Sequence, residues 1–430
     1  MGGPPMTSNV TREELYAAVE DNRDEAFEFL DELLRIETEN PPGRNYRAGA
    51  DFLESELLER GYDVDLVTVP ESAVAEHYPE RTEHERVNVV ARKGDPGSEA
   101  PDIHFTGHFD VVPAGEDWTR DPYEPTVEDG LLYARGSSDM KSGIAASVLA
   151  VDALEAAGVP IPGSLTQSMT VDEETGGFTG LGHLVSEGYV TRENTDYCVY
   201  TECFDSSTVC LGHRGVLKFR VIADGEKAHG CMAQDGHNAL MSMRDFLSRI
   251  DEYEGRLHER TTDQPVTPPE SKRADVSATM IDAGYSENVV PDRCTATFYR
   301  VLVPEETVEG AREEIEALMT ESEAATGSTF DYEEIMFAEP TVVPRDCTVA
   351  RTYADEIEPF HGQAEFVVSP GSDDQRFVVN DAGIEECIVY GPGLLDQAHV
   401  ADEHVPLAEV GTAAKVMAAA SADLMGVLDE

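Results

Sequence analysis

Histidine and carboxylate side chains recur in this sequence directly after short apolar stretches of strand-like composition. Four such stretches cover 103–107, 164–171, 196–201 and 387–391, and the segment GSSD at 136–139 leads into an apolar helical stretch. Because ligands of open α/β sheets bind beyond the carboxyl ends of the strands, we expect these side chains to gather at one edge of a sheet. The side chains in question are His108, Asp110, Asp139, Glu173, Glu174, Glu202 and His399.

A set of imidazoles and carboxylates without thiolates is typical of a site for zinc, cobalt or manganese. Two metal ions that share one carboxylate need about five direct ligands. We expect two divalent ions, with zinc as the first choice and cobalt or manganese as alternatives. His404 is an alternative ligand to His399, but the AH-x-x-x-E arrangement favours His399. The predicted ligands are His108, Asp139, Glu174, Glu202 and His399.

Two further carboxylates suit supporting and catalytic roles. Asp110 stands two residues after His108, so in extended backbone both side chains point the same way and Asp110 can accept the second ring N–H of His108. The adjacent Glu173 and Glu174 must diverge, so one can bind a metal ion while the other holds the attacking water. A free carboxylate of this kind acts as general base and then as acid toward the leaving amine, as in metal-assisted amide hydrolysis.

The elements that must position these side chains alternate between strands and helices. Helices are predicted from Thr11, where TREE forms a capping box, and over 48–60 and 141–157. After Gly212 the pattern changes to strands of alternating polarity with helices at 238–253 and 305–325. We predict an α/β fold whose mixed, mostly parallel sheet carries helices on both faces and is formed by residues 1–212 and 337–430, with an inserted α+β domain at 213–336.

Composition restricts the class of protein. The 430 residues contain 86 Asp and Glu against 31 Lys and Arg, a formal charge of -55, so a nucleic-acid partner is not expected. Only six residues are lysine, and the acids are spread over the whole length, which suggests a protein that folds in molar salt, where screening suppresses this repulsion. An ordinary acidic protein is the alternative.

No apolar stretch of 18 residues or signal-like N-terminus occurs, so we expect neither a membrane span nor secretion. The expected location is a high-salt cytoplasm.

The sequence resembles a known family, the M20 metallopeptidases. This group includes acetylornithine deacetylase, succinyl-diaminopimelate desuccinylase, aminoacylase and glutamate carboxypeptidase. The resemblance runs in order over nearly the whole chain. The segments that carry it are TGHFDVVPAG (106–115), LLYARGSSDMKSG (131–143), TVDEETGG (170–177), YTEC (200–203), EKAHGCMAQDGHNAL (226–240), YSENVVPD (285–292), SDDQRF (372–377) and GPGLLDQAHVADEHV (391–405).

The resemblance implies roles for the metal site. Asp139 bridges two zinc ions, one of which is also bound by His108 and Glu202. The other is bound by Glu174 and His399. Glu173 is the general base, and the peptide bond after Asp139 is expected to be cis.

The inserted domain is similar to the family's lid and dimerisation domain, which implies a homodimer in which His229 polarises the scissile carbonyl in a partner subunit. Asn288 is expected to contact the substrate, and Gly371 with Ser372 to lie near the substrate carboxylate. At position 301 valine replaces the family's carboxylate-binding arginine, so that contact is made by Arg300, one position early, or by Arg376, or it is lost.

The function implied is a metal-dependent amide hydrolase that removes an acyl group from an N-acyl amino acid. A di- or tripeptidase or carboxypeptidase of the same family is the first alternative, with a short peptide as substrate. A binding protein with an inactive site on the same fold is the remote alternative.

Overall fold

The computed structural model describes residues 10–96 and 100–429 and divides into two compact units. The first unit contains Met1–Leu211, Val343–Phe366 and Asp374–Glu430. The second contains Gly212–Val342 and Val367–Asp373, where the sequence suggested an insertion at 213–336.

The first unit is built on a mixed sheet with a parallel centre. Strands β6, β3, β7 and β15 are neighbours and run parallel, so their carboxyl ends meet at one edge. Antiparallel strands extend the sheet on both sides, as the predicted mixed α/β class requires. The order is β1 (Asp63–Thr68), β2 (Val87–Gly94), β6 (Ser164–Thr170), β3 (Asp102–His108), β7 (Tyr197–Tyr200), β15 (Cys387–Val389) and β8 (Thr208–His213).

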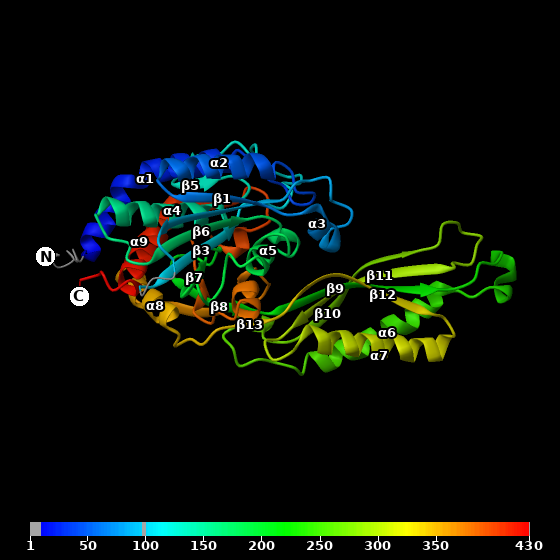
Figure 1. The fold of residues 1–430 in the computed structure, drawn as a ribbon. Coiled ribbons are helices and arrows are strands. Elements are labelled where there is room, and N and C mark those ends of the chain that lie inside the picture. Colours follow the sequence, from blue (N-terminus) through cyan, green and yellow to red (C-terminus); the bar gives the residue numbers. More distant parts are fainter. Residues whose placement is uncertain (1–9, 97–99, 430) are drawn as a thin grey trace. The chain divides into compact units, whose positions relative to one another are not determined.

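Helices cover this sheet, and α4 (Lys141–Ala156) is the most deeply buried of them. It packs against β3 and β6 on one side and against α1 (Arg12–Leu34) and α9 (Leu407–Leu424) on the other, as Figure 1 shows. This position explains its composition, because a helix enclosed on all sides needs apolar or small residues around its whole circumference. The predicted capping box at Thr11 is present at the start of α1. The remaining helices of this unit are α2 (Tyr46–Glu59), α3 (Glu71–His77), α5 (Leu181–Ser186) and α8 (Thr348–His361).

A small second sheet lies in the same unit. Its order is β16-β5-β4, and β16 joins the C-terminal segment to the segment before Asp139 by pairing with β5. Two short strands, β13 (Thr341–Val342) and β14 (Glu365–Ser369), lie near the unit boundaries. The bounds of the small sheet are β4 (Thr126–Glu128), β5 (Leu131–Tyr133) and β16 (His404–Pro406).

The second unit is an antiparallel sheet covered on one face by two helices. Figure 1 shows α6 (Ala239–Leu257) and α7 (Val308–Thr326) along the same face. The strand order is β10 (Asp275–Ala283), β11 (Arg293–Leu302), β9 (Gly215–Asp224) and β12 (Phe330–Ala338).

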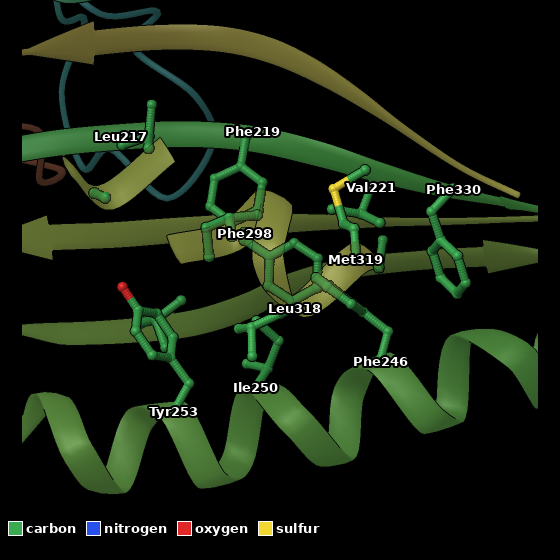
Figure 2. Close-up of a cluster of buried hydrophobic side chains, with 14 of the residues drawn as sticks. Leu217, Phe219, Val221, Phe246, Ile250, Tyr253, Phe298, Leu318, Met319 and Phe330 are labelled. Carbon is green, nitrogen blue, oxygen red and sulfur yellow. The ribbon is translucent and has the colours of Figure 1, made fainter. Parts of the chain in front are cut away.

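Aromatic side chains form the centre of this unit's core. Phe219 of β9 and Phe298 of β11 stack with ring centroids 5.1 Å apart, and Phe246 of α6 meets Phe298 edge-on at 5.6 Å. Figure 2 shows Ile250 and Tyr253 on the same face of α6, pointing toward the sheet. The alternation along β11 is therefore a one-sided pattern, with the buried positions facing the helices. Among the described residues, every helix is too short or too polar to cross a lipid bilayer.

A buried histidine in β3 should make stability depend on pH. Burial lowers the pKa of His104 to about 3, and its Nε2 lies 2.8 Å from the Ser168 hydroxyl. Below pH 6.5 the unfolded chain binds a proton that the folded chain excludes, so stability is lost as pH falls through that value. Between pH 7.5 and 5.0 the free energy of unfolding of the wild type should fall by about 2 kcal/mol relative to His104→Gln, measured by urea unfolding at fixed salt. Parallel curves for the two proteins would contradict this.

Candidate active site

The five predicted ligands form two clusters that share one carboxylate. His108, Asp139 and Glu202 make one cluster, and Asp139, Glu174 and His399 make the other, with ligand atoms within 4.8 Å of one another in each. Asp139 contributes a different oxygen to each cluster: Oδ1 lies 3.2 Å from His108 Nε2 and Oδ2 lies 3.1 Å from His399 Nε2. One carboxylate thus faces both sets of ligands.

The sheet edge explains how segments far apart in sequence converge. His108 is the last residue of β3, Glu174 lies in a short turn directly after β6, and Glu202 follows β7 by two residues. Since these strands are parallel neighbours, their following residues share one edge. The other two ligands come from loops, Asp139 from the turn before α4 and His399 from the segment after β15, where it has a left-handed φ of 62°. The Asp139–Met140 peptide bond is cis, as the resemblance implied.

Direct contacts hold each ligand in place. Glu202 Oε2 lies 3.4 Å from His108 Nε2, while its Oε1 accepts a hydrogen bond of 2.9 Å from the N–H of Cys203. Glu174 Oε2 lies 2.9 Å from His399 Nε2, and its Oε1 accepts from the N–H of Val112 at 3.0 Å. In both glutamates one oxygen is anchored to the backbone and the other faces a histidine.

Electrostatics mark the clusters as strongly anionic. Burial would lower the pKa of His108, but the neighbouring carboxylates of Asp110, Asp139 and Glu202 outweigh that effect and raise the pKa. Asp139 and Glu174 raise the pKa of His399 to about 11. Burial, followed by the charge of Asp139, raises the pKa of Glu174 to about 7. The carboxylates outnumber the positive charges available to them, a balance that favours bound cations.

The chemistry of the donors fits a pair of divalent cations. His108 is fully buried, and its Nε2 has no hydrogen-bond partner among the described residues although carboxylate oxygens lie 3.2 and 3.4 Å away. An imidazole nitrogen surrounded by carboxylates in this way is suited to coordinate a metal ion. The donor set contains imidazole and carboxylate and no thiolate, which suits zinc, cobalt or manganese.

Asp110 organises the site differently from the sequence-based prediction. The nearest acceptor for His108 Nδ1 is the backbone carbonyl of Asp110 at 2.9 Å, while the carboxylate Oδ1 lies farther away at 3.4 Å. The Asp110 carboxylate instead accepts hydrogen bonds from the backbone N–H groups of Glu173 and Glu174, both at 3.3 Å, and from Asn40 Nδ2 at 2.9 Å. Asp110 therefore fixes the turn that carries the two glutamates as well as the ring of His108.

Glu173 lies beside the two ligand clusters but belongs to neither. Its Oε2 is 3.9 Å from His108 Nε2, and burial raises the pKa of its carboxyl group. The preceding Asp172, at a left-handed φ of 64°, is buried and accepts hydrogen bonds from Tyr46 at 2.9 Å, from Arg86 at 2.8 Å and from Thr179. The turn that positions Glu173 is thus held at Asp172 and at Asp110. No role was assigned to Asp172 or Arg86 from the sequence, and only the position of Asp172 beside Glu173 could have indicated one.

Glu403 is a second residue whose role the sequence did not reveal. It is fully buried, and its carboxylate accepts hydrogen bonds from the backbone of the Asp139 loop and from Arg135. Burial raises the pKa of Glu403, while Arg135 and the backbone donors oppose that shift. Its only sequence signal is its position four residues after His399.

Arg376, a candidate for substrate binding, lies in the first unit and is buried. Its Nη2 donates a hydrogen bond of 2.5 Å to the carbonyl of Gly176, and its guanidinium stacks on Phe377 at 4.3 Å. It therefore supports the loop that follows Glu174. A contact with substrate stays a prediction.

The second unit holds the other candidates. His229 and Asn288 lie on adjacent exposed segments, joined by a hydrogen bond of 2.7 Å from Gly230 N–H to the Asn288 carbonyl. Gly371 and Ser372 are partly exposed, and their roles stay predictions. Arg300 is different, because it is fully buried and paired with Glu306 at 2.6 Å. Arg300 is therefore a core residue of the second unit, and it is not a candidate for substrate binding.

Comparison with known sequences agrees with this geometry. Residues 104–423 match the sequence profile described as Peptidase family M20/M25/M40. A succinyl-diaminopimelate desuccinylase of Xanthomonas campestris is 31% identical over 73% of this chain and 81% of its own length. A protein of the same name from Alkalilimnicola ehrlichii is 29% identical over 81% of this chain and 90% of its own length.

Solved structures of similar fold have lower sequence identity. The dipeptidase Dug1p from Saccharomyces cerevisiae superposes with a TM-score of 0.76 at 16% identity, covering 96% of this chain and 98% of its own. The metallo-carboxypeptidase Sso-CP2 from Sulfolobus solfataricus has a TM-score of 0.74 at 17% identity, covering 92% and 98%. These similarities concern the fold.

Proposed function

Because the chain belongs to Peptidase family M20/M25/M40, we propose that it is a metal-dependent amide hydrolase that removes the acyl group from an N-acyl amino acid. The observation that carries the proposal is the arrangement of Asp139, with one oxygen toward each ligand cluster and the non-ligating Glu173 alongside. A shared carboxylate with a free carboxylate beside it is the arrangement that amide hydrolysis by two metal ions needs.

In the proposed reaction, water adds to the amide carbonyl, the C–N bond breaks, and a carboxylic acid and an amine are released. Two divalent cations, zinc in our proposal, would be held by His108, Glu202, Asp139, Glu174 and His399. When bound, such cations supply Lewis acidity to the carbonyl and lower the pKa of water. Glu173 removes a proton from the attacking water and transfers it to the leaving nitrogen. Asp110 and Asp172 keep Glu173 in position through the turn described above.

The substrate class rests on the relatives. The desuccinylases match this chain along most of their length, which supports an N-acyl amino acid as substrate. The alternative is a di- or tripeptidase or a carboxypeptidase, which the fold of the dipeptidase and carboxypeptidase neighbours favours. The cluster geometry argues against an inactive binding protein, because that role needs no free carboxylate beside five convergent ligands.

A panel of N-acetyl, N-succinyl and dipeptide substrates tests the proposal. We expect hydrolysis of an N-acyl amino acid, its loss after chelation and its return with added zinc or cobalt. Activity that survives complete metal removal would refute the metal-dependent reaction, and hydrolysis of dipeptides alone would favour the alternative. The panel is run in molar and dilute salt, because we also propose a high-salt cytoplasmic setting. Full stability in dilute buffer would contradict that setting.

We also propose a homodimer formed through the second unit. β10 is an edge strand of the four-stranded sheet, and its Met280 and Ile281 are 70% and 55% exposed. An exposed apolar edge strand is suited to pair with another chain. His229, also in the second unit, is proposed to act in the active site of the partner subunit.

Mixing two inactive variants tests both parts of the dimer proposal. If His229 acts across the interface, an equal mixture of His229→Ala and Glu173→Ala chains should recover about one quarter of wild-type activity, since half of the dimers are mixed and each has one complete site. Ile281→Lys in both chains should abolish the recovery and produce monomers in light scattering. The matched control is Val127→Lys on the exposed strand β4, which should leave the dimer intact. No recovery from confirmed mixed dimers would contradict the role of His229.

A further inference from the structure

One carboxylate oxygen of Glu403 is the centre of the loop that carries Asp139. Glu403 Oε1 accepts hydrogen bonds from three backbone N–H groups, those of Gly136 at 3.1 Å, Ser138 at 2.8 Å and Asp139 at 3.0 Å. Three amides of one loop that converge on one carboxylate oxygen form a small anion-binding site, and the loop backbone is held around that oxygen. The conformation of residues 136–139 therefore depends on the position of Glu403.

The second oxygen of Glu403 is paired with a buried arginine. Arg135 Nη1 donates a hydrogen bond of 2.5 Å to Oε2, and both side chains are almost completely buried. The backbone of the two segments is also joined, because the N–H of Ala134 donates to the Glu403 carbonyl at 3.2 Å. A buried carboxylate needs such compensation on both oxygens, and here the loop and Arg135 supply it.

This arrangement ties together the two segments that carry Asp139 and His399. Glu403 stands four residues after His399, and it binds the residue that faces both clusters. A second link runs alongside, since the Ser138 hydroxyl donates to the Leu394 carbonyl at 3.1 Å and accepts from the Leu394 N–H at 2.9 Å. A displacement of the loop would move Asp139 away from His108 and His399 together.

We propose that Glu403 is a positioning residue that sets Asp139 relative to His399 and thereby determines the affinity of the site for both cations. The inference rests on the proposed function, because it presumes that the two clusters bind metal ions. Glu403 acts through the backbone of the loop, and it is distinct from the five ligands. Residues that orient metal ligands in this way contribute about 10- to 100-fold to metal affinity in other proteins.

Cobalt titration of the metal-free full-length protein tests the proposal. The wild type should bind two Co²⁺ ions per chain, and Glu403→Gln should weaken that binding by about 10- to 100-fold and alter the visible absorption of bound cobalt. Glutamine has nearly the same shape as glutamate. Its NH2 group is a hydrogen-bond donor, however, and it must face either the three backbone N–H groups or Arg135, which are donors as well. The matched control is Glu386→Gln. Glu386 also accepts a backbone hydrogen bond, from Val349 at 2.9 Å, but it does so at the start of α8 and should leave cobalt binding unchanged.

The possible outcomes separate the two proposals. Folded Glu403→Gln protein with wild-type affinity and spectrum would overturn the inference, and so would an equal loss of affinity in Glu386→Gln. If Glu403→Gln does not fold, Glu403→Asp keeps the charge but withdraws the carboxylate by one methylene from the three N–H groups, and it should weaken cobalt binding in the same direction. Wild-type affinity in Glu403→Asp would then overturn the inference. A wild-type protein that binds no cobalt would instead refute the proposed function.

Discussion

Replacing Glu173 with glutamine is expected to lower kcat by about 10²- to 10⁴-fold, the usual contribution of a positioned general base. Metal content should stay at the wild-type value, because Glu173 belongs to neither ligand cluster. The amide of glutamine keeps the size of the side chain and removes only its capacity to accept and return a proton. Steady-state hydrolysis of the best substrate of the panel, together with metal analysis of the same sample, measures both quantities.

The control for Glu173→Gln is Glu187→Gln, an exposed glutamate directly after α5. It makes the same chemical change in the same unit and should leave kcat and metal content unchanged. Loss of metal from Glu173→Gln would identify Glu173 as a ligand and contradict the assigned role. Retention of full kcat would exclude Glu173 as the base.

The convergence of the five candidate ligands was the most predictable feature of the site. The five proposed ligands could be named because each follows a recognisable strand or precedes a helix, and parallel strands have to deliver their following residues to one edge. Neither the left-handed φ of His399 nor the distances within the clusters could be derived in this way, because they depend on contacts between segments remote in sequence.

There is a physical reason why the residues that support the site could not be predicted from the sequence. Glu403 and Asp172 are two among 86 acidic residues, and the only sequence signal of each is its spacing from a site residue, four positions after His399 for Glu403 and one before Glu173 for Asp172. What marks them is convergence of donors from elsewhere, Arg135 and loop amides for Glu403, Arg86 and Tyr46 for Asp172. Asp110 was named, but its main contacts are with the turn after β6, which adjacency to His108 could not indicate.

Periodicity predicted the long helices and the short strands that lead to the site well, but it could not assign the role of a single residue. The helices α1, α4 and α6 begin within a few residues of the predicted positions, since each has a clear start signal or an unbroken apolar pattern. Arg300 shows the opposite case. A single residue beside an expected anchor was assigned to substrate, whereas the regular alternation of β11 places it among the buried residues facing α6.

Replacing Asp139 with alanine should remove both metal ions, whereas replacing a ligand of one cluster should remove one. Asp139 directs Oδ1 toward His108 and Oδ2 toward His399, so its loss takes a donor from each cluster. Because residues that only orient a ligand are worth about 10- to 100-fold in affinity, the loss of a shared direct ligand should cost at least about 100-fold at both sites. Hydrolysis should fall below detection.

The comparison that makes this prediction specific uses Glu202→Ala and His399→Ala. Each belongs to one cluster only, so each variant should retain one tightly bound cobalt ion in a calorimetric titration, while Asp139→Ala retains none. Circular dichroism at the same salt concentration separates this pattern from general unfolding. One tight ion in Asp139→Ala would mean that its two oxygens serve a single cluster. The bridging role would then be excluded, because the geometry that suggests it depends on both oxygens binding at once.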